Sequence, residues 1–304
     1  MPIVDLISRH ALEFLIGIVT LALLCAAAVL FLAQLAWKGR EQIWACVAGT
    51  VGWIKHVPPV RWFAGKFPRI AGALSLQRLT ATGFLELYLA AGLLLSAGTL
   101  LFLSLGEDIL EKSGLVAFDL QLATALQNTI TQKQLAFLIP ITRLGNGATL
   151  TVLGLVVGTL LLVRKQRTLA IGWLLTLFGA GVLNVVLKAS FHRVRPEYAT
   201  IGGWSFPSGH AMGSFVAYGM LAYLGAIFLP RRPAQIMAGV LFLLVLLIGF
   251  SRLYLGVHYF SDVVAGYSAA VVWLAVCVSG TEVARLRGLR VKAFAPSSAG
   301  GAGV

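Results

Sequence analysis

Two short polar segments of the chain concentrate residue types that bind phosphate. The residues concerned are Lys188, Arg195, Ser208, Gly209, His210, Arg252, His258 and Asp262. Lysine and arginine supply permanent positive charge, and an arginine can bind two phosphate oxygens at once. Ser208 and Gly209 precede an apolar run, where the start of a helix presents backbone N–H groups to an anion and glycine permits close approach. The two segments together predict a phosphate-binding site.

The histidines of these segments predict a covalent mechanism. His258 and Asp262 are four residues apart, which places both on one face of a helix. Asp262 can then accept the Nδ1–H group of His258 and leave Nε2 free as a nucleophile. His210 is left to protonate the departing oxygen and then to activate the water that hydrolyses the phosphohistidine.

Plainer interpretations exist for the same residues. Each histidine could cap a helix end, and Lys188 and Arg195 could be interfacial anchors whose charged ends reach the head groups. The register of the histidines with Arg252 and Asp262 favours the chemical interpretation. His192 and Arg193 fall outside this register, so we expect head-group contact or solvation for both.

The composition indicates the surroundings in which this chemistry takes place. Of the 304 residues 59% are hydrophobic and 12% are charged, and the mean hydropathy is +0.89. A soluble domain has about 45–50% apolar and about 25% charged residues. The chain is therefore predicted to be an all-α polytopic membrane protein, which excludes a soluble nucleotide-binding enzyme, a disordered scaffold and a disulfide-stapled module.

The apolar runs predict where the chain crosses the bilayer. We expect a retained N-terminal transmembrane helix at Ala11–Trp37 and an interfacial or re-entrant helix at Ile43–Ile54. Further predicted spans are Leu79–Leu105, Ala148–Val163, Leu169–Leu187, Ala211–Leu229, Ile236–Phe250 and Tyr259–Ser279. The polar stretch Glu107–Gln134, with Leu115, Phe118, Leu122 and Leu126 at helical spacing, is expected to lie on the membrane surface.

The links between the spans predict domains and orientation. Residues 1–78 form an anchor with a basic interfacial segment, 79–284 a membrane core, and 285–304 a basic and then disordered tail. The first part could be a degenerate partner domain, an oligomerisation element or a tether, and we favour the tether. Basic residues gather in alternate links, which places those links in the cytoplasm and the phosphate site on the opposite, periplasmic face. The net charge of +13 is thus assigned to anionic lipid head groups, not to nucleic acid.

The order and spacing of these residues resemble a known family. Three motifs carry the resemblance: Lys188 followed after six residues by Arg195-Pro196, then Pro207-Ser208-Gly209-His210, then Ser251-Arg252 followed after five residues by His258 and after three more by Asp262. They are similar to the three signature motifs of the type-2 phosphatidic acid phosphatase superfamily. The resemblance covers roughly Leu79 to Gly280. It implies a six-helix core, metal-independent hydrolysis through a phosphohistidine, and lipid phosphates or isoprenoid pyrophosphates as substrates.

From the residues and the resemblance together we expect a lipid phosphatase of the bacterial inner membrane. It would hydrolyse a lipid phosphomonoester or an isoprenoid (undecaprenyl) pyrophosphate at the periplasmic face, without metal or cofactor. Membrane lipids and the lipid phosphate substrate are its expected partners, with no nucleic acid and no obligate protein partner. The alternatives are a lipid phosphotransferase that uses the same phosphohistidine and a non-enzymatic protein that binds or transports lipid phosphates.

The choice of lipid is expected to depend on the pocket walls, including Trp204 and Phe206. Phosphatidylglycerol phosphate, phosphatidic acid, undecaprenyl pyrophosphate and a lipid A phosphate all fit the chemistry. Of these, the sequence leads us to favour a carrier-lipid pyrophosphate.

Overall fold

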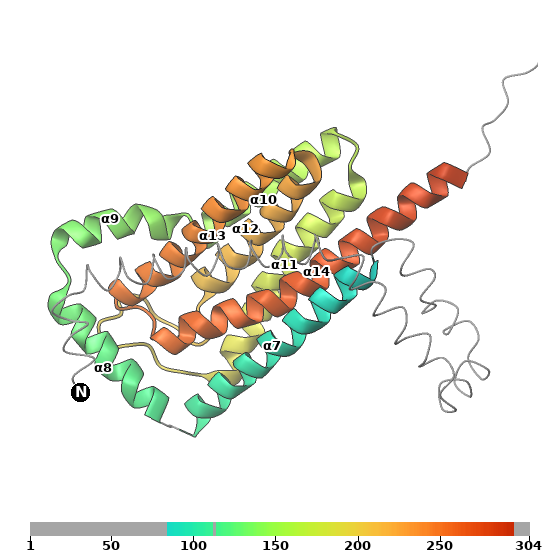
Figure 1. Cartoon of the computed structure of the whole chain (residues 1–304). Helices are drawn as coiled ribbons and strands as arrows, with labels where there is room; N and C mark the ends of the chain where they lie inside the picture. The colour runs from blue at the N-terminus through green and yellow to red at the C-terminus, as the bar shows by residue number, and fades with distance from the viewer. Residues whose placement is uncertain (1–83, 112–113, 295–304) are drawn as a thin grey trace, which may run out of the picture. The chain divides into compact units, whose positions relative to one another are not determined.

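The computed structural model describes residues 84–111 and 114–294, with side chains for 91–111 and 114–285. The predicted N-terminal helix at Ala11–Trp37, the interfacial segment at Ile43–Ile54 and the tail at 295–304 lie outside the described residues. Within these ranges the chain is all helical (Figure 1). The helices are α7 (Phe84–Leu110), α8 (Gly114–Thr129), α9 (Gln132–Arg143), α10 (Gly147–Val163), α11 (Arg167–Phe191), α12 (Gly209–Phe228), α13 (Arg231–Tyr254) and α14 (Phe260–Phe294).

Six segments of the described chain are long and apolar enough to cross a membrane. They are Ala91–Leu110, Gln132–Val163, Arg167–Phe191, Gly209–Phe228, Arg231–Tyr254 and Phe260–Arg285. This confirms the predicted all-α polytopic class and its six-helix core. Several helices extend beyond the predicted spans, as α14 does in reaching Phe294. The reason is that polar residues propagate a helix as well as apolar ones, whereas hydropathy marks only the apolar middle.

The outward faces of these helices carry large apolar side chains. Val163, Phe178 and Leu93 are 74%, 73% and 71% exposed. Water would disfavour such a surface, whereas lipid chains do not. Together with the six apolar helices, this makes the chain a multi-pass membrane protein.

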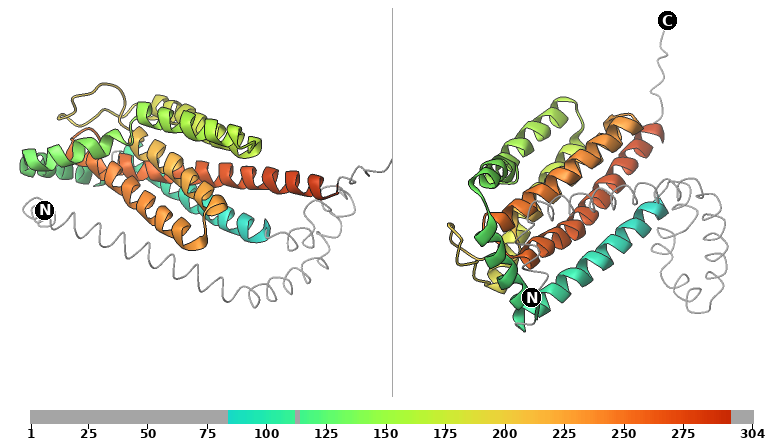
Figure 2. Two further views of the ribbon diagram at one scale, coloured as in Figure 1. Left: turned by 90° about the horizontal axis from the view of Figure 1, so that it is seen from above. Right: turned by 60° about the vertical axis from the view of Figure 1, so that its left-hand side comes forward.

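Helix α12 lies at the centre of the bundle. Half of its span is buried, against 17% for the span that includes most of α7. It packs mainly against α11, α13 and α14 (Figures 1 and 2). Met212, Val216 and Met220 are fully buried along it. Because α12 begins at Gly209, this packing fixes the position of the predicted phosphate-binding turn.

Two polar rings inside the bundle donate to backbone carbonyls of neighbouring helices, as an apolar environment favours. The buried Trp173 indole donates from Nε1 to the Gly154 carbonyl at 2.9 Å. Tyr267 donates its hydroxyl to the Val245 carbonyl at 2.7 Å. A Cβ atom at Gly249 would lie 1.9 Å from the Tyr267 hydroxyl, so the close approach of α13 and α14 requires glycine there.

Helix α8 crosses one end of the bundle and contacts α13 and α14 (Figures 1 and 2). Leu122 and Leu126 are buried as the helical spacing predicted, and Phe118 packs against the same cluster. That face also carries Asp119, which is fully buried and which the apolar pattern did not predict.

Helix α9 was not predicted either, because Pro140 and the polar start of the helix interrupt the apolar pattern. The signal that identifies it is a capping box. The Thr131 side chain accepts from the Gln134 amide at 3.3 Å, and Gln134 Oε1 accepts from the Thr131 amide at 2.8 Å.

The turn between α13 and α14 depends on Gly256. Its φ of +64° is disfavoured for side-chain-bearing residues, and an added Cβ would lie 2.9 Å from the Gln127 side chain. We expect Gly256→Ala to destabilise the fold by about 1–2 kcal/mol. The apparent Tm in detergent should fall by about 2–8 °C.

Gly239→Ala on α13 is the control, because no atom beyond its own helix lies within 4 Å of an added Cβ. Its Tm should stay the same or rise. An unchanged Tm for Gly256→Ala would show that the turn accepts a side chain.

Candidate functional site

The structure brings the predicted phosphate-binding and catalytic residues together at one end of the bundle. Arg195 contacts His258, which contacts Asp262, whose backbone carbonyl accepts the Ser208 amide. Gly209 follows Ser208 directly. The charge of His210 interacts with those of Lys188, Arg195, Arg252 and His258. The cluster is assembled from α11, α12, α13, α14 and the two loops that join them at this end.

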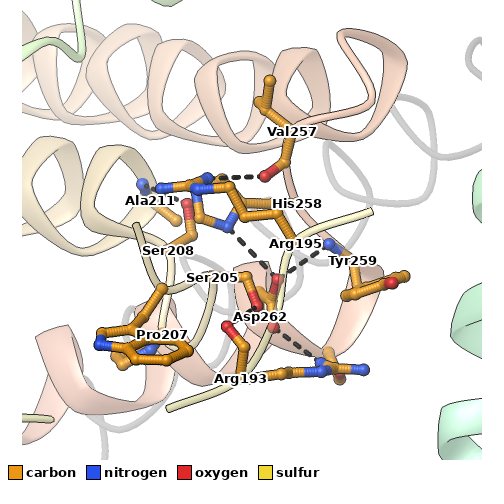
Figure 3. Close-up of polar contacts among 12 residues, drawn as sticks. Arg193, Arg195, Ser205, Pro207, Ser208, Ala211, Val257, His258, Tyr259 and Asp262 are labelled. Carbon is orange, nitrogen blue, oxygen red and sulfur yellow. Dashed lines mark hydrogen bonds and ion pairs between the residues drawn. The ribbon is translucent and has the colours of Figure 1, made fainter. Parts of the chain in front are cut away.

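His258 and Asp262 form a buried pair at the start of α14 (Figure 3). His258 Nδ1 lies 3.3 Å from Asp262 Oδ2, as their spacing predicted. The same carboxylate oxygen accepts the Tyr259 amide at 2.9 Å. The carboxylate is therefore held by the first turn of its own helix, where the helix dipole also favours negative charge.

The contacts of His258 define its tautomer. Arg195 Nη1 lies 3.1 Å from His258 Nε2. A guanidinium can only donate, so Nε2 accepts, and the ring proton is on Nδ1, which donates to Asp262. Burial, opposed in part by Asp262, lowers the pKa of His258 to about 4. At neutral pH the imidazole is therefore neutral, with its lone pair on Nε2.

Two cations, Lys188 and Arg195, act on His258, and their hydrogen bonds are directed mainly to backbone. Lys188 donates to the Trp204 and Ser205 carbonyls. Arg195 donates to the Gly202, Gly203 and Val257 carbonyls. Neither is neutralised by an ion pair among the described residues. Burial lowers the pKa of Arg195, with Asp262 opposing the shift, but a guanidinium remains charged in proteins.

Arg252 is the third cation and is buried at the end of α13. Its Nη1 donates to Thr142 Oγ1 at 2.8 Å. Its Nε has no partner in the described part of the chain. Because an unpaired buried donor costs about 1–3 kcal/mol, and more for a charged group, an anion is the natural partner for this guanidinium.

The turn before α12 differs in one detail from the sequence prediction. Ser208 is the N-cap, and its Oγ accepts from the Ala211 amide at 3.5 Å. The Ser208 amide donates to the Asp262 carbonyl at 2.9 Å and so does not face an anion, contrary to the prediction for this group. The first-turn amides of Gly209 and His210 have no acceptor inside the helix. Phosphate binding by backbone amides therefore remains a prediction for Gly209 and His210.

Arg193 is where the sequence prediction failed most clearly. It was expected to be solvated or in contact with head groups, but it pairs with Asp262 at 2.7 Å and with Asp119 at 2.8 Å (Figure 3 shows the first pair). It also lies over the Tyr259 ring, 4.3 Å from the centroid. The available signal was Asp119, an acidic residue among the apolar positions of α8. Its partner lies 74 residues away in sequence, which no local pattern reveals.

Three other residues of the same loop have simpler positions. His192 is exposed at the end of α11, in edge-to-face contact with the Trp204 ring. Trp204 is 41% exposed and is available to a lipid, as expected. Phe206 is fully buried against Phe102 and Phe191, so the expectation that it lines the substrate pocket is wrong.

The donor set of the site suits an anion better than a metal ion. Among residues 84–111 and 114–294, no three His, Cys, Asp or Glu side chains come together. Both buried carboxylates of this end, Asp119 and Asp262, are paired with Arg193. What remains is the imidazoles of His258 and His210 among three cations.

Comparison with known proteins finds a family match in one part of the chain. Residues 169–285 match the model of the PAP2 superfamily. Over this segment the chain is similar to the PAP2 superfamily. This confirms the resemblance seen in the sequence motifs, and the matched segment contains all the predicted site residues.

Relatives of known name are bacterial. The chain is 39% identical over 108 residues to phosphatidylglycerophosphatase B of Bacillus subtilis (strain 168). That match covers 33% of this chain and 52% of the relative, so it spans about half the length of that PAP2 protein.

Two crystal structures resemble the fold. That of a transmembrane PAP2 type phosphatidylglycerolphosphate phosphatase from Bacillus subtilis has 27% identity and a TM-score of 0.58, covering 62% of this chain and 96% of that one. That of Aquifex aeolicus LpxE has 23% identity and a TM-score of 0.42, covering 55% of this chain and 95% of that one.

The state of His258 can be measured without substrate. In protein labelled with 15N-histidine, we expect the His258 resonances to show the Nδ1–H tautomer and to titrate near pH 4, well below the value of about 6.5 for a free imidazole. The resonances that disappear in the His258→Gln variant are those of His258. A midpoint above pH 6, or a proton on Nε2 at neutral pH, would contradict this description of the site.

Proposed function

We propose that this chain is a metal-independent phosphatase of membrane lipid phosphates. The observation that carries the proposal is the arrangement around His258. Its unprotonated Nε2 is in contact with Arg195, in the electrostatic field of Lys188. A nucleophilic nitrogen among permanent cations, at the end of a membrane-spanning bundle, suits attack on a lipid-bound phosphate.

The first step is exchange of the partners of Arg195. Its Nη1 donates to His258 Nε2 in the ligand-free site, which blocks the lone pair. Phosphate oxygens attract the guanidinium more strongly than a neutral imidazole does, because charge-assisted bonds are about twice as strong as neutral ones. Arg195 then binds the phosphate with Lys188 and Arg252, and Nε2 is released to face the phosphorus atom.

The second step forms the P–N bond and breaks the bond to the leaving group. Nε2 of His258 attacks phosphorus, and His210 donates a proton to the lipid oxygen as its P–O bond breaks. The imidazole acquires positive charge, which the Asp262 carboxylate stabilises through Nδ1–H. Lys188, Arg195 and Arg252 stabilise the negative charge on the phosphoryl oxygens in the transition state.

The third step restores the enzyme. His210, which has lost its proton, accepts one from a water molecule as that water attacks phosphorus. The P–N bond breaks, inorganic phosphate leaves, and Nε2 of His258 regains its lone pair. Asp262 holds the Nδ1–H proton throughout and is not itself protonated.

The substrate proposed first is phosphatidylglycerophosphate. A similar protein and a similar crystal structure, both from Bacillus subtilis, are named for this activity, which moves the preference away from the carrier-lipid pyrophosphate favoured from the sequence. The loop that carries Arg195 also exposes Val194, Ile201 and Trp204, which can contact lipid chains beside the phosphate site.

The proposed location is the bacterial inner membrane, with the site on the periplasmic face. In the described chain the links at the far end of the helices carry Arg164, Lys165, Arg167, Arg231 and Arg232. Basic links of this kind remain in the cytoplasm. The site, at the opposite ends of α11 to α14, is then periplasmic.

The direct test is phosphate release by the purified protein in detergent with EDTA present. The panel is phosphatidylglycerophosphate, phosphatidic acid, undecaprenyl pyrophosphate and a lipid A phosphate. We expect turnover with EDTA, fastest on phosphatidylglycerophosphate. In His258→Ala it should fall by a factor of about 10⁶, the loss known for removing a catalytic nucleophile.

His192→Ala is the matched control, because it removes an exposed histidine of the adjacent loop and should keep wild-type turnover. A His258→Ala protein that releases phosphate at the wild-type rate would refute the assignment. Label from the donor appearing in a second lipid, and not in free phosphate, would instead identify a phosphotransferase. Binding of the lipids with no turnover in the wild type would indicate a binding protein.

A further inference from the structure

A buried ion-pair network joins the surface helix α8 to the nucleophile. Arg193 donates from Nη1 to Asp262 Oδ1 at 2.7 Å and from Nη2 to Asp119 Oδ2 at 2.8 Å. Both carboxylates are fully buried, and the arginine side chain is only 9% exposed. One guanidinium therefore bridges two acids that water does not reach.

Asp119 also holds the start of α14, which begins two residues after His258. Its Oδ1 accepts the Ser261 amide at 3.1 Å, and its Oδ2 accepts the Ser261 hydroxyl. An N-terminal helix amide has no acceptor within its own helix, so Asp119 supplies that acceptor from another helix. The position of α14 relative to the loop of Arg193 is thereby fixed.

The bridge leaves one oxygen of Asp262 for His258. Arg193 occupies Oδ1, while Oδ2 accepts from His258 Nδ1 and the Tyr259 amide. An arginine readily binds both oxygens of one carboxylate. Because its second nitrogen is held by Asp119, Arg193 stays on Oδ1 and does not compete with His258 for Oδ2.

We propose that Asp119 and Arg193 are positioning residues for the His258–Asp262 pair. Asp119 keeps Arg193 on one oxygen of Asp262, and Arg193 orients the carboxylate so that the other oxygen fixes the ring and tautomer of His258. The inference rests on the proposed function, since it concerns the nucleophile of that reaction. Neither residue belongs to the signature motifs that identified the site.

The charges around His258 explain why two acids are needed. Lys188, Arg195 and His210 interact electrostatically with the imidazole from the other elements of the site, and Arg252 interacts with His210. Asp119, Arg193 and Asp262 together carry one net negative charge, with Asp119 offsetting Arg193. This charge counters the positive charge that the imidazole acquires as Nε2 attacks phosphorus.

The test compares Asp119→Asn and Arg193→Lys with the wild-type protein. Asparagine keeps an acceptor for the Ser261 amide but loses the ion pair, and lysine keeps the charge but cannot span both carboxylates with separate nitrogens. We expect kcat to fall about 10–100-fold in each, the range for residues that orient a directly acting group. KM should change little, because Lys188, Arg195 and Arg252 are untouched.

Two further readouts separate positioning from a general structural role. The 15N-histidine spectrum should show His258 losing its single Nδ1–H tautomer in both variants. The double variant should be no less active than the less active of the two single variants, because the effects of residues that act as a unit are not additive. If Asp119→Asn does not fold, Ser261→Ala replaces it as the test variant, because it removes only one hydroxyl from the network. It should show the same tautomer change in milder form.

Glu107→Gln and Arg232→Lys are the matched controls, since both side chains are exposed. They should keep the wild-type kcat and spectrum. Wild-type kcat and an unchanged tautomer in Asp119→Asn and Arg193→Lys, beside an inactive His258→Ala, would overturn the positioning role and leave the phosphatase standing. If His258→Ala were fully active, the proposed function would fail, and the tautomer measurement alone would decide the positioning role.

Discussion

The hydrogen bond between Asp262 and His258 is the interaction on which the rest of the site depends. A carboxylate buried at the end of an apolar bundle is costly unless it is paired and fully hydrogen-bonded. Here Asp262 accepts from His258, Tyr259 and Arg193, so both of its oxygens are hydrogen-bonded. In return it fixes the proton of His258 on Nδ1 and leaves Nε2 unprotonated. The packing of α12 against α14 matters to function because it delivers Ser208 and His210 to this pair.

Two arginines of one loop have different electrostatic roles. Arg193 and Arg195 are separated by one residue in the loop between α11 and α12. Figure 3 shows them on either side of the His258–Asp262 pair. Arg193 neutralises buried carboxylates, whereas Arg195 contacts the nucleophilic nitrogen and, with Lys188, keeps its charge unpaired. A single cation could not do both, because a guanidinium paired with a carboxylate attracts a phosphate weakly.

The sequence predicted the parts of this protein that depend on local pattern. Apolar length predicted the six spans, and the four-residue spacing predicted the contact of His258 with Asp262. The predicted helix face was wrong in detail, because His258 lies two residues before the start of α14. The sequence could not reveal Arg193 with Asp119, because that pair joins elements brought together only by tertiary packing. Helix α9 was missed because Pro140 interrupts its pattern, and the use of the Ser208 amide by the Asp262 carbonyl depends on how two helix starts meet. The choice of lipid does not follow from a motif, because it is a property of the surface that receives the lipid chains.

The central claim is that Nε2 of His258 becomes phosphorylated during turnover. The most direct measurement is a rapid quench with substrate labelled in its terminal phosphate, followed by isolation of the protein and peptide mapping of the label. The account predicts transient label on His258 at close to one phosphate per active site, stable in alkali and lost in acid, and absent from His258→Ala. Phosphate release at the full rate with no label on the protein, or with label on another residue, would contradict it.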